Sequence, residues 1–245
     1  MQPTIIEDTI SIAAGQTNEN VIVSNASLRG LLNTPYPCKI KVLAVTSGAG
    51  LRIDFTHGSK KAIDNSDPRI ATFPEDPLDL INSDVYAQAQ EQIVLRCNNS
   101  TAGPLSLSYR IMLTPVVDDS WDGNMVDLPP DCVVMQRLQS IAAAAVDVQL
   151  LDGLTFQQLA VPGYLRVLMT GSAPGLLRQL FIDQDRIAPP SVVAASNRMP
   201  QDPFDSTIDG VEVPANAQQF LSVSNPTAGA LTIRWKTKFQ KLVRE

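Results

Sequence analysis

The chain has 245 residues, enough for two domains of ordinary size that each bury their own core. Its net charge is −6, and only 18% of its residues are charged, which argues against a general nucleic-acid coat because neutralising phosphates requires clustered Lys and Arg. No segment offers the roughly 18 uninterrupted apolar residues of a membrane span, so we expect a soluble chain without one.

The first part of the chain predicts β-structure. Residues 8–24 alternate loosely around a Gly-Gln-Thr-Asn turn, which is typical of strand, turn and strand. After a proline-rich break at 33–37, a strong strand is expected over 39–46. The turn at 47–50 leads into a second strand at 51–55, and we expect the two strands to form a hairpin.

A long polar loop is predicted over 57–72. It closes on Phe73-Pro74-Glu75-Asp76-Pro77-Leu78-Asp79, in which an Asp before Pro and a second Asp are typical of a helix start. His57 is the only histidine, and the polar residues after it favour an exposed loop histidine over a catalytic one. The paired carboxylates Asp76 and Asp79 are interpreted as helix caps, with glycoside cleavage as the alternative.

The end of this part is repeated 126 residues later. The segments 85–113 and 211–239 align without a gap and share nine of 29 residues, including Asn99, Thr101, Ala102 and Gly103. Each copy predicts a strand, at 91–97 or 217–223, followed by a polar turn and a last strand. A duplicated domain is the economical explanation, and it makes Cys97, Tyr109 and Trp235 core residues.

Residues 116–145 have no counterpart in this alignment. The acidic part, 116–131, begins like a calcium loop at Asp118, but position twelve is Pro129 in place of the bidentate Glu, so a solvated linker is favoured. Residues 132–145 have apolar side chains at helical spacing after Asp131 and predict a linker helix. The expected domains are therefore residues 1–115, the linker 116–145 and residues 146–245.

The second copy repeats the upstream pattern, with strands over 165–170 and 176–182 and a loop over 183–198 that closes on Asp202 and Asp205. At the same offset, Arg52 aligns with Arg178 and Phe55 with Phe181. Four or more strands in each copy, with little helix, predict an all-β protein of two tandem antiparallel β-sandwich domains, jelly-roll-like, joined by a helix.

Chemical sites are weakly indicated. The sequence contains no phosphate-binding, dinucleotide-binding, zinc-protease or serine-hydrolase motif, and one histidine cannot build a multi-histidine metal site. The three cysteines have no paired spacing, which predicts free thiols and fits a reducing cytoplasm. We therefore expect no catalytic residue, no cofactor and no metal, and a protein that is not an enzyme.

One surface stands out in this acidic chain. Along the last strand, basic residues alternate with Trp235, Thr237 and Phe239, so that one strand face is basic. A merely solvated face is the simpler interpretation, and a contact with an acidic surface of another subunit is the sharper one. The candidate interface residues are Arg234, Lys236, Lys238, Lys241 and Arg244.

The duplicated strand pattern and the phrases 92–103 and 218–229 resemble the tandem jelly-roll coat proteins and other virion structural proteins of tailed or icosahedral bacteriophages. The resemblance implies a capsid coat or decoration component that forms homotrimers or larger assemblies with itself and other virion proteins. It would be assembled in the host cytoplasm, located in the virion and without a specific nucleic-acid partner. The alternatives are a tail or collar adaptor, and a carbohydrate- or receptor-binding module with Trp121 as its platform.

Overall fold

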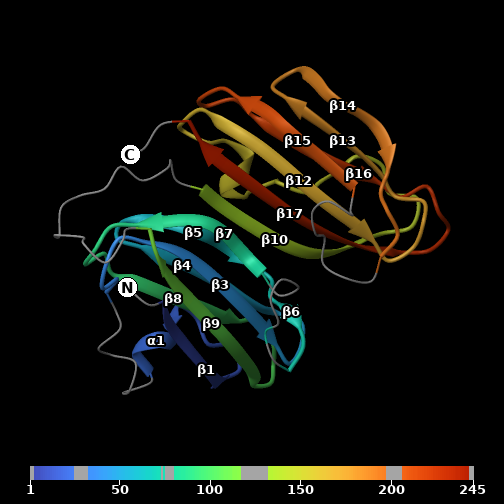
Figure 1. Cartoon of the computed structure of the whole chain (residues 1–245). Coiled ribbons are helices and arrows are strands. Elements are labelled where there is room, and N and C mark those ends of the chain that lie inside the picture. The colour runs from blue at the N-terminus through green and yellow to red at the C-terminus, as the bar shows by residue number, and fades with distance from the viewer. Residues whose placement is uncertain are drawn as a thin grey trace. The chain divides into compact units, whose positions relative to one another are not determined.

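The computed structural model describes residues 3–24, 33–72, 74, 80–116, 132–196 and 206–242. The chain divides into two compact units, Met1–Met135 (unit 1) and Gln136–Glu245 (unit 2). Figure 1 shows that strands dominate both units. Each unit is an antiparallel β-sandwich of the jelly-roll type, which confirms the predicted fold class.

Unit 1 is built from two sheets. The first sheet joins β1, β9, β3 and β6 in that order, with β7 also paired with β3, and the second joins β5, β4, β8 and β2. The elements are β1 (Thr4–Ile12), β2 (Glu19–Asn20), α1 (Val21–Ser24), β3 (Cys38–Thr46), β4 (Leu51–His57), β5 (Lys60–Ser66), β6 (Arg69–Ile70), β7 (Leu80–Ala87), β8 (Ile93–Asn99) and β9 (Leu105–Pro115).

Unit 2 also has two sheets. One joins β15, β12, β17 and β10, and the other joins β11, β16, β13 and β14. The elements are β10 (Cys132–Ile141), which begins in unit 1, β11 (Val148–Gln149), the 3₁₀ turn η2 (Thr155–Gln157), β12 (Gly163–Gly171), β13 (Leu177–Ile182), β14 (Asp185–Val192), β15 (Ser206–Val213), β16 (Gln219–Ser224) and β17 (Leu231–Lys241).

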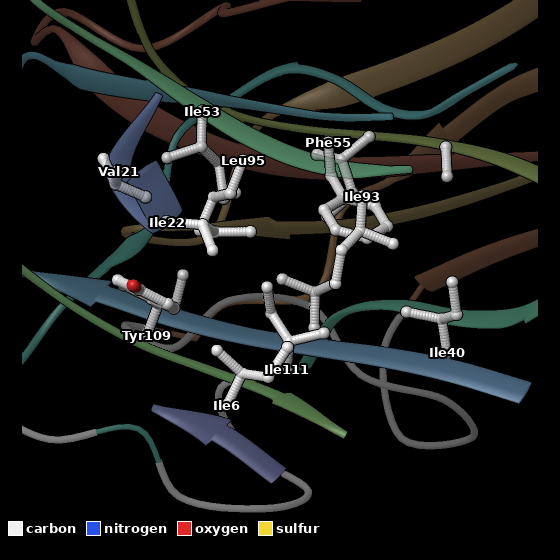
Figure 2. Close-up of a cluster of buried hydrophobic side chains, with 14 of the residues drawn as sticks. Ile6, Val21, Ile22, Ile40, Ile53, Phe55, Ile93, Leu95, Tyr109 and Ile111 are labelled. Carbon is white, nitrogen blue, oxygen red and sulfur yellow. The ribbon is translucent and has the colours of Figure 1, made fainter. Parts of the chain in front are cut away.

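The core of unit 1 lies between its sheets. Along β9, Leu107, Tyr109, Ile111 and Leu113 are buried at every second position, as a strand with one face inward requires. Figure 2 shows Tyr109 and Ile111 together with side chains of β1, β4, β8 and α1 pointing into one interior. Each fully buried Ile or Leu contributes about 1.5–3 kcal/mol to folding, so this layer supplies the main stabilisation of the sandwich.

Two turns at the ends of β8 and β16 are built around a buried asparagine. In unit 1, Asn99 Nδ2 donates hydrogen bonds to the carbonyls of Ile12, Ala13 and Gly103, at 3.1, 3.0 and 3.0 Å. Its Oδ1 accepts from the backbone N–H and the hydroxyl of Thr101, at 3.0 and 2.7 Å. The Asn side chain thus ties the turn to the end of β1.

Unit 2 repeats this arrangement bond for bond. Asn225 Nδ2 donates to the carbonyls of Ile141, Ala142 and Gly229, and Oδ1 accepts from Thr227. The threonine methyl group packs beside a glycine of positive φ in both units. A Cβ on Gly50 (φ +99°) would lie 2.5 Å from Thr101 Cγ2, and one on Gly175 (φ +121°) would lie 2.7 Å from Thr227 Cγ2, so only glycine fits there.

These contacts define which residues correspond between the units. Ile12 corresponds to Ile141, an offset of 129, whereas the strands β8 and β9 correspond to β16 and β17 at 126. Gly50 corresponds to Gly175 at 125. The common framework supports the predicted duplication and extends it to β1 and β10.

The ungapped alignment of Arg52 with Arg178 and Phe55 with Phe181 is therefore wrong by one residue. Arg52 pairs with Asn98, whereas Leu177 pairs with Ser224, which corresponds to Asn98. Phe55 accordingly corresponds to Leu180, and both are buried. The strands β3, β4 and β5 correspond to β12, β13 and β14 at an offset of 125, and the offset becomes 126 only at β7 and β15. The ungapped comparison at 126 therefore assigned every side chain of β13 to the wrong face.

The linker helix predicted over 132–145 is also wrong. Residues Cys132–Ile141 form β10, and a turn with Ala144 (φ 52°) and Asp147 (φ 49°) follows. Apolar residues four apart fit a helix, but β10 is hydrogen-bonded to β17 and takes the place that β1 has in unit 1. Sheet pairing has overridden the local periodicity and the helix propensity of the alanines.

Two connections also differ from the expectation. The strands over 39–46 and 51–55 do not form a hairpin, because β3 pairs with β9 and β7 while β4 pairs with β5 and β8, in the other sheet. The polar stretches 57–72 and 183–198 contain the strands β5 and β14. Two polar faces on a strand remove the alternation that sequence patterns detect. The predicted second strand within 8–24 is replaced at its end by the short α1.

The strands predicted over 91–97 and 217–223 and the last strand of each copy are confirmed as β8, β16, β9 and β17. Tyr109 and Trp235 are buried, as predicted. The three cysteines are free and buried, and burial, followed by the charge of Glu19, raises the pKa of Cys97 to about 12. Cys97 is thus a protonated core thiol.

Candidate functional site

The basic face predicted on the last strand is present on β17. Ile233, Trp235, Thr237 and Phe239 are buried, and the residues between them, Arg234, Lys236 and Lys238, are half-buried on the opposite side. The period of two places the three cations in one row. We call Arg234, Lys236 and Lys238 the basic face.

The register of β12 against β17 adds a fourth cation. Arg166 lies opposite Lys238, Leu168 opposite Lys236 and Thr170 opposite Arg234. Sequence reasoning missed Arg166, because the pairing of β12 with β17 joins segments about 70 residues apart. This pair brings two cations together at the Lys238 end of the basic face.

The other two candidate residues do not belong to the basic face. Lys241 lies opposite Gly163, at an odd position of β17 that shares the side of Phe239. Arg244 lies outside the described residues. Arg234 is partly fixed by its own unit, since its Nη1 donates a 3.3 Å hydrogen bond to the carbonyl of Ser196, and burial lowers its pKa.

The corresponding surface of unit 1 has a different charge. Ser108, Arg110 and Met112 stand where the basic face has its cations, and Arg110 Nε lies 2.8 Å from Glu7 Oε2 of β1. A pocket on this side is lined by side chains of both charges. Its lining residues are Glu7, Asp8, Thr9, Pro74, Ser108, Tyr109 and Arg110. The two units therefore share a framework and differ in the surface that they present.

His57 is not the exposed loop residue that the sequence favours. It ends β4, is 1% exposed, and its Nδ1 lies 2.6 Å from Glu91 Oε2, with the N–H donating to the carboxylate. Burial is the largest effect on Glu91 and raises its pKa, but the hydrogen bond and charge of His57, the Gln88 backbone hydrogen bond and the charge of Lys60 together outweigh it, so the pKa of Glu91 lies below its usual range. The backbone of Glu91 also holds Thr34: the Glu91 carbonyl accepts a 2.9 Å hydrogen bond from the Thr34 N–H, and the Glu91 N–H donates a 3.0 Å hydrogen bond to Thr34 Oγ1. The pair anchors the chain entering β3.

We expect Glu91→Gln to lower the free energy of unfolding at neutral pH, because it removes a charge-assisted hydrogen bond. A carboxyl whose folded pKa is depressed stabilises the fold above its unfolded pKa and loses that effect as the pH falls through the folded value. The difference between wild type and variant should therefore shrink on acidification below the usual Glu range, as measured by urea unfolding at several pH values. A stability difference between wild type and variant that did not change with pH would contradict a stabilising ion pair of His57 and Glu91.

Unit 2 buries polar side chains where unit 1 buries isoleucines. Gln219 corresponds to Ile93 and Thr237 to Ile111, and both are fully buried. Neither side-chain amide atom of Gln219 has a hydrogen-bond partner within the part of the chain that the structure describes, nor has the hydroxyl of Thr237. Arg178, at the position of Ile53, is also buried, which lowers its pKa. This interior is less apolar than that of unit 1.

Several sequence candidates lie outside the described residues: the calcium-like loop from Asp118 to Pro129, Trp121, and the carboxylates Asp76, Asp79, Asp202 and Asp205. Across the residues that are described, no group of three or more His, Cys, Asp or Glu side chains could hold a metal ion. The described helices are all too short to cross a membrane.

No family model matches the chain, and no curated protein does. Solved structures of two viral proteins are similar to it. One is the STIV MCP, with 12% identity and a TM-score of 0.43 over 97% of this chain and 96% of that one. The other is the major capsid protein P2 from Bacteriophage PM2, with 11% identity and a TM-score of 0.40 over 100% and 99%.

Proposed function

We propose that the chain is a virion structural protein that catalyses no reaction and assembles through the surfaces of its β-sandwiches as a coat or decoration component of a capsid. The observation that carries the proposal is the pair of tandem sandwiches on one hydrogen-bonded framework, with different side chains on their outer faces. Such a chain can offer two distinct surfaces in a regular arrangement, which suits it to contacts with several neighbours.

Exposed apolar side chains on strands support the same proposal. Ile5 on β1 and Ile187 and Val192 on β14 are more than 40% exposed although they lie in regular strands. Single exposed apolar residues are ordinary, but both strands lie at the end of a sheet, where backbone groups also lack a neighbouring strand. Other copies of the chain, or other virion proteins in the assembled particle, would cover these edges.

Light scattering combined with negative-stain microscopy of the purified protein tests the function. We expect a discrete oligomer, a homotrimer or a larger assembly, and under favourable conditions shells or patches of lattice. A monomer at every concentration and salt condition would count against a structural role.

The basic face would take part in these contacts. Four cations on two paired strands, in a chain whose net charge is −6, favour an acidic surface of another subunit as the partner.

In the double variant Lys236→Glu, Lys238→Glu, like charges would face each other across the contact. At low salt, the protein concentration needed for self-association should therefore rise roughly tenfold or more. Light scattering across a dilution series measures it. The matched control is Lys39→Glu, Lys41→Glu on β3, which makes the same change of net charge in unit 1. Equal association of both variants and wild type would remove the basic face from the interface.

A further inference from the structure

One contact of β10 indicates how edge strands of this protein can pair with one another. β10 begins in unit 1, where Val134 forms a parallel bridge with Ile63 of β5. Both residues are fully buried. The edge of β5 is thereby covered by the beginning of a strand that is the counterpart of β1.

The counterparts of these two residues make no such pair. Val134 corresponds to Ile5 at the offset of 129, and Ile63 corresponds to Ala188 at the offset of 125, since Phe55 pairs with Ile63 as Leu180 pairs with Ala188. Within the described residues, β1 pairs only with β9, and β14 only with β13. Ile5 is 52% exposed where Val134 is fully buried.

We propose that β14 of one copy of the chain lies along β1 of a second copy, in parallel, with Ala188 next to Ile5. This inference rests on the proposed self-assembly and names the strands that carry it. Sheet edges with unpaired backbone groups pair readily with strands of other chains, and here the chain itself carries both edges. The counterpart bridge of Val134 and Ile63 supplies the register.

The sequence of β14 limits the length of the contact. Pro189 and Pro190 follow Ala188 and have no N–H to donate, so the pairing ends there. The bridge at Val134 is equally short. Apolar burial of Ile5 against the end of β14 would add to the few hydrogen bonds.

Because the two edges differ, the contact is head to tail. Each copy presents β1 to one neighbour and β14 to another, so association continues until a ring closes or a filament grows. Such a contact gives assemblies larger than two copies without any other interface.

Cysteine cross-linking tests the register. Chains carrying Ile5→Cys are mixed with chains carrying Ala188→Cys, oxidised and run on a non-reducing gel. Neighbouring strands lie about 4.8 Å apart, within the Cα separation that a disulfide bridges. The native thiols are buried and stay out of reach. We expect a covalent dimer in the mixture and much less of it with either variant alone.

The matched control is Ser11→Cys mixed with Ala188→Cys. Ser11 is six residues further along β1, about 20 Å from Ile5, and should not cross-link. Ile5→Lys should in addition weaken association roughly tenfold by placing a charge on the edge. Light scattering on the same samples separates the outcomes. Oligomers without the cross-link would overturn the β1–β14 contact and leave self-assembly standing, whereas monomers throughout would overturn both.

Discussion

Asn99→Ala is expected to lower the free energy of unfolding by about 3 kcal/mol or more, because one truncation removes five hydrogen bonds inside the sandwich. Asn99 is 1% exposed, so water cannot freely replace the lost amide. The carbonyls of Ile12 and Gly103 and the N–H of Thr101 would each lose this partner. Urea unfolding followed by circular dichroism measures the loss.

The charge variant sharpens this test. Asn99→Asp keeps the shape of the side chain but turns the donor into an oxygen that faces three carbonyls, so it should be at least as damaging as Asn99→Ala at neutral pH. Asn98→Ala is the matched control. Asn98 accepts one exposed hydrogen bond, from the N–H of Asn18, and its loss should cost well under half as much. If the two alanine variants were equally stable, the buried amide would not be what holds the turn.

Replacing Gln219 and Thr237 together by isoleucine is expected to stabilise unit 2 by about 2–4 kcal/mol, because it exchanges buried polar atoms without protein partners for the side chains that unit 1 uses at the same positions. Both sites are in strands, where β-branched residues pack well. Against the background Trp121→Phe, fluorescence of Trp235 follows the unfolding of unit 2 alone.

The reciprocal change gives the control. Ile93→Gln places an amide in the apolar interior of unit 1 and should destabilise that unit by about 3 kcal/mol or more, as measured by hydrogen exchange of peptides from β8 and β9. A double variant in unit 2 that is less stable than wild type would show that Gln219 and Thr237 are satisfied in the folded protein, for example by bound water.

The strands that alternate apolar and polar residues could be predicted from the sequence. β8, β9, β16 and β17 have one buried face and one polar face, and their sequences were kept similar enough between the copies to align. β5 and β14 could not be predicted, because they carry polar residues on both sides. β10 could not be predicted either, because its alanines and four-residue spacing fit a helix, and only pairing in a sheet decides otherwise.

The surface could be predicted only in part. Alternation on β17 correctly identified Arg234, Lys236 and Lys238 as one row. The position of Arg166 beside Lys238, and the side of β17 to which Lys241 points, depend on strand register, which sequence spacing does not determine. The burial of His57 was missed because its partner, Glu91, is 34 residues away. A single-residue slip between the copies concealed the buried Arg178.

The position of β1 has a consequence for synthesis of the chain. Thr4 pairs with Leu113, so β1 leaves the ribosome more than 100 residues before its partner strand. Such distant pairing makes folding slow, and the apolar face of β1 stays uncovered in the meantime. β10 and β17, the first and last strands of the sheets of unit 2, are paired in the same way. Each half therefore becomes able to fold only when its last strand emerges, and a chain cut short within β9 would expose an unfinished sandwich to aggregation.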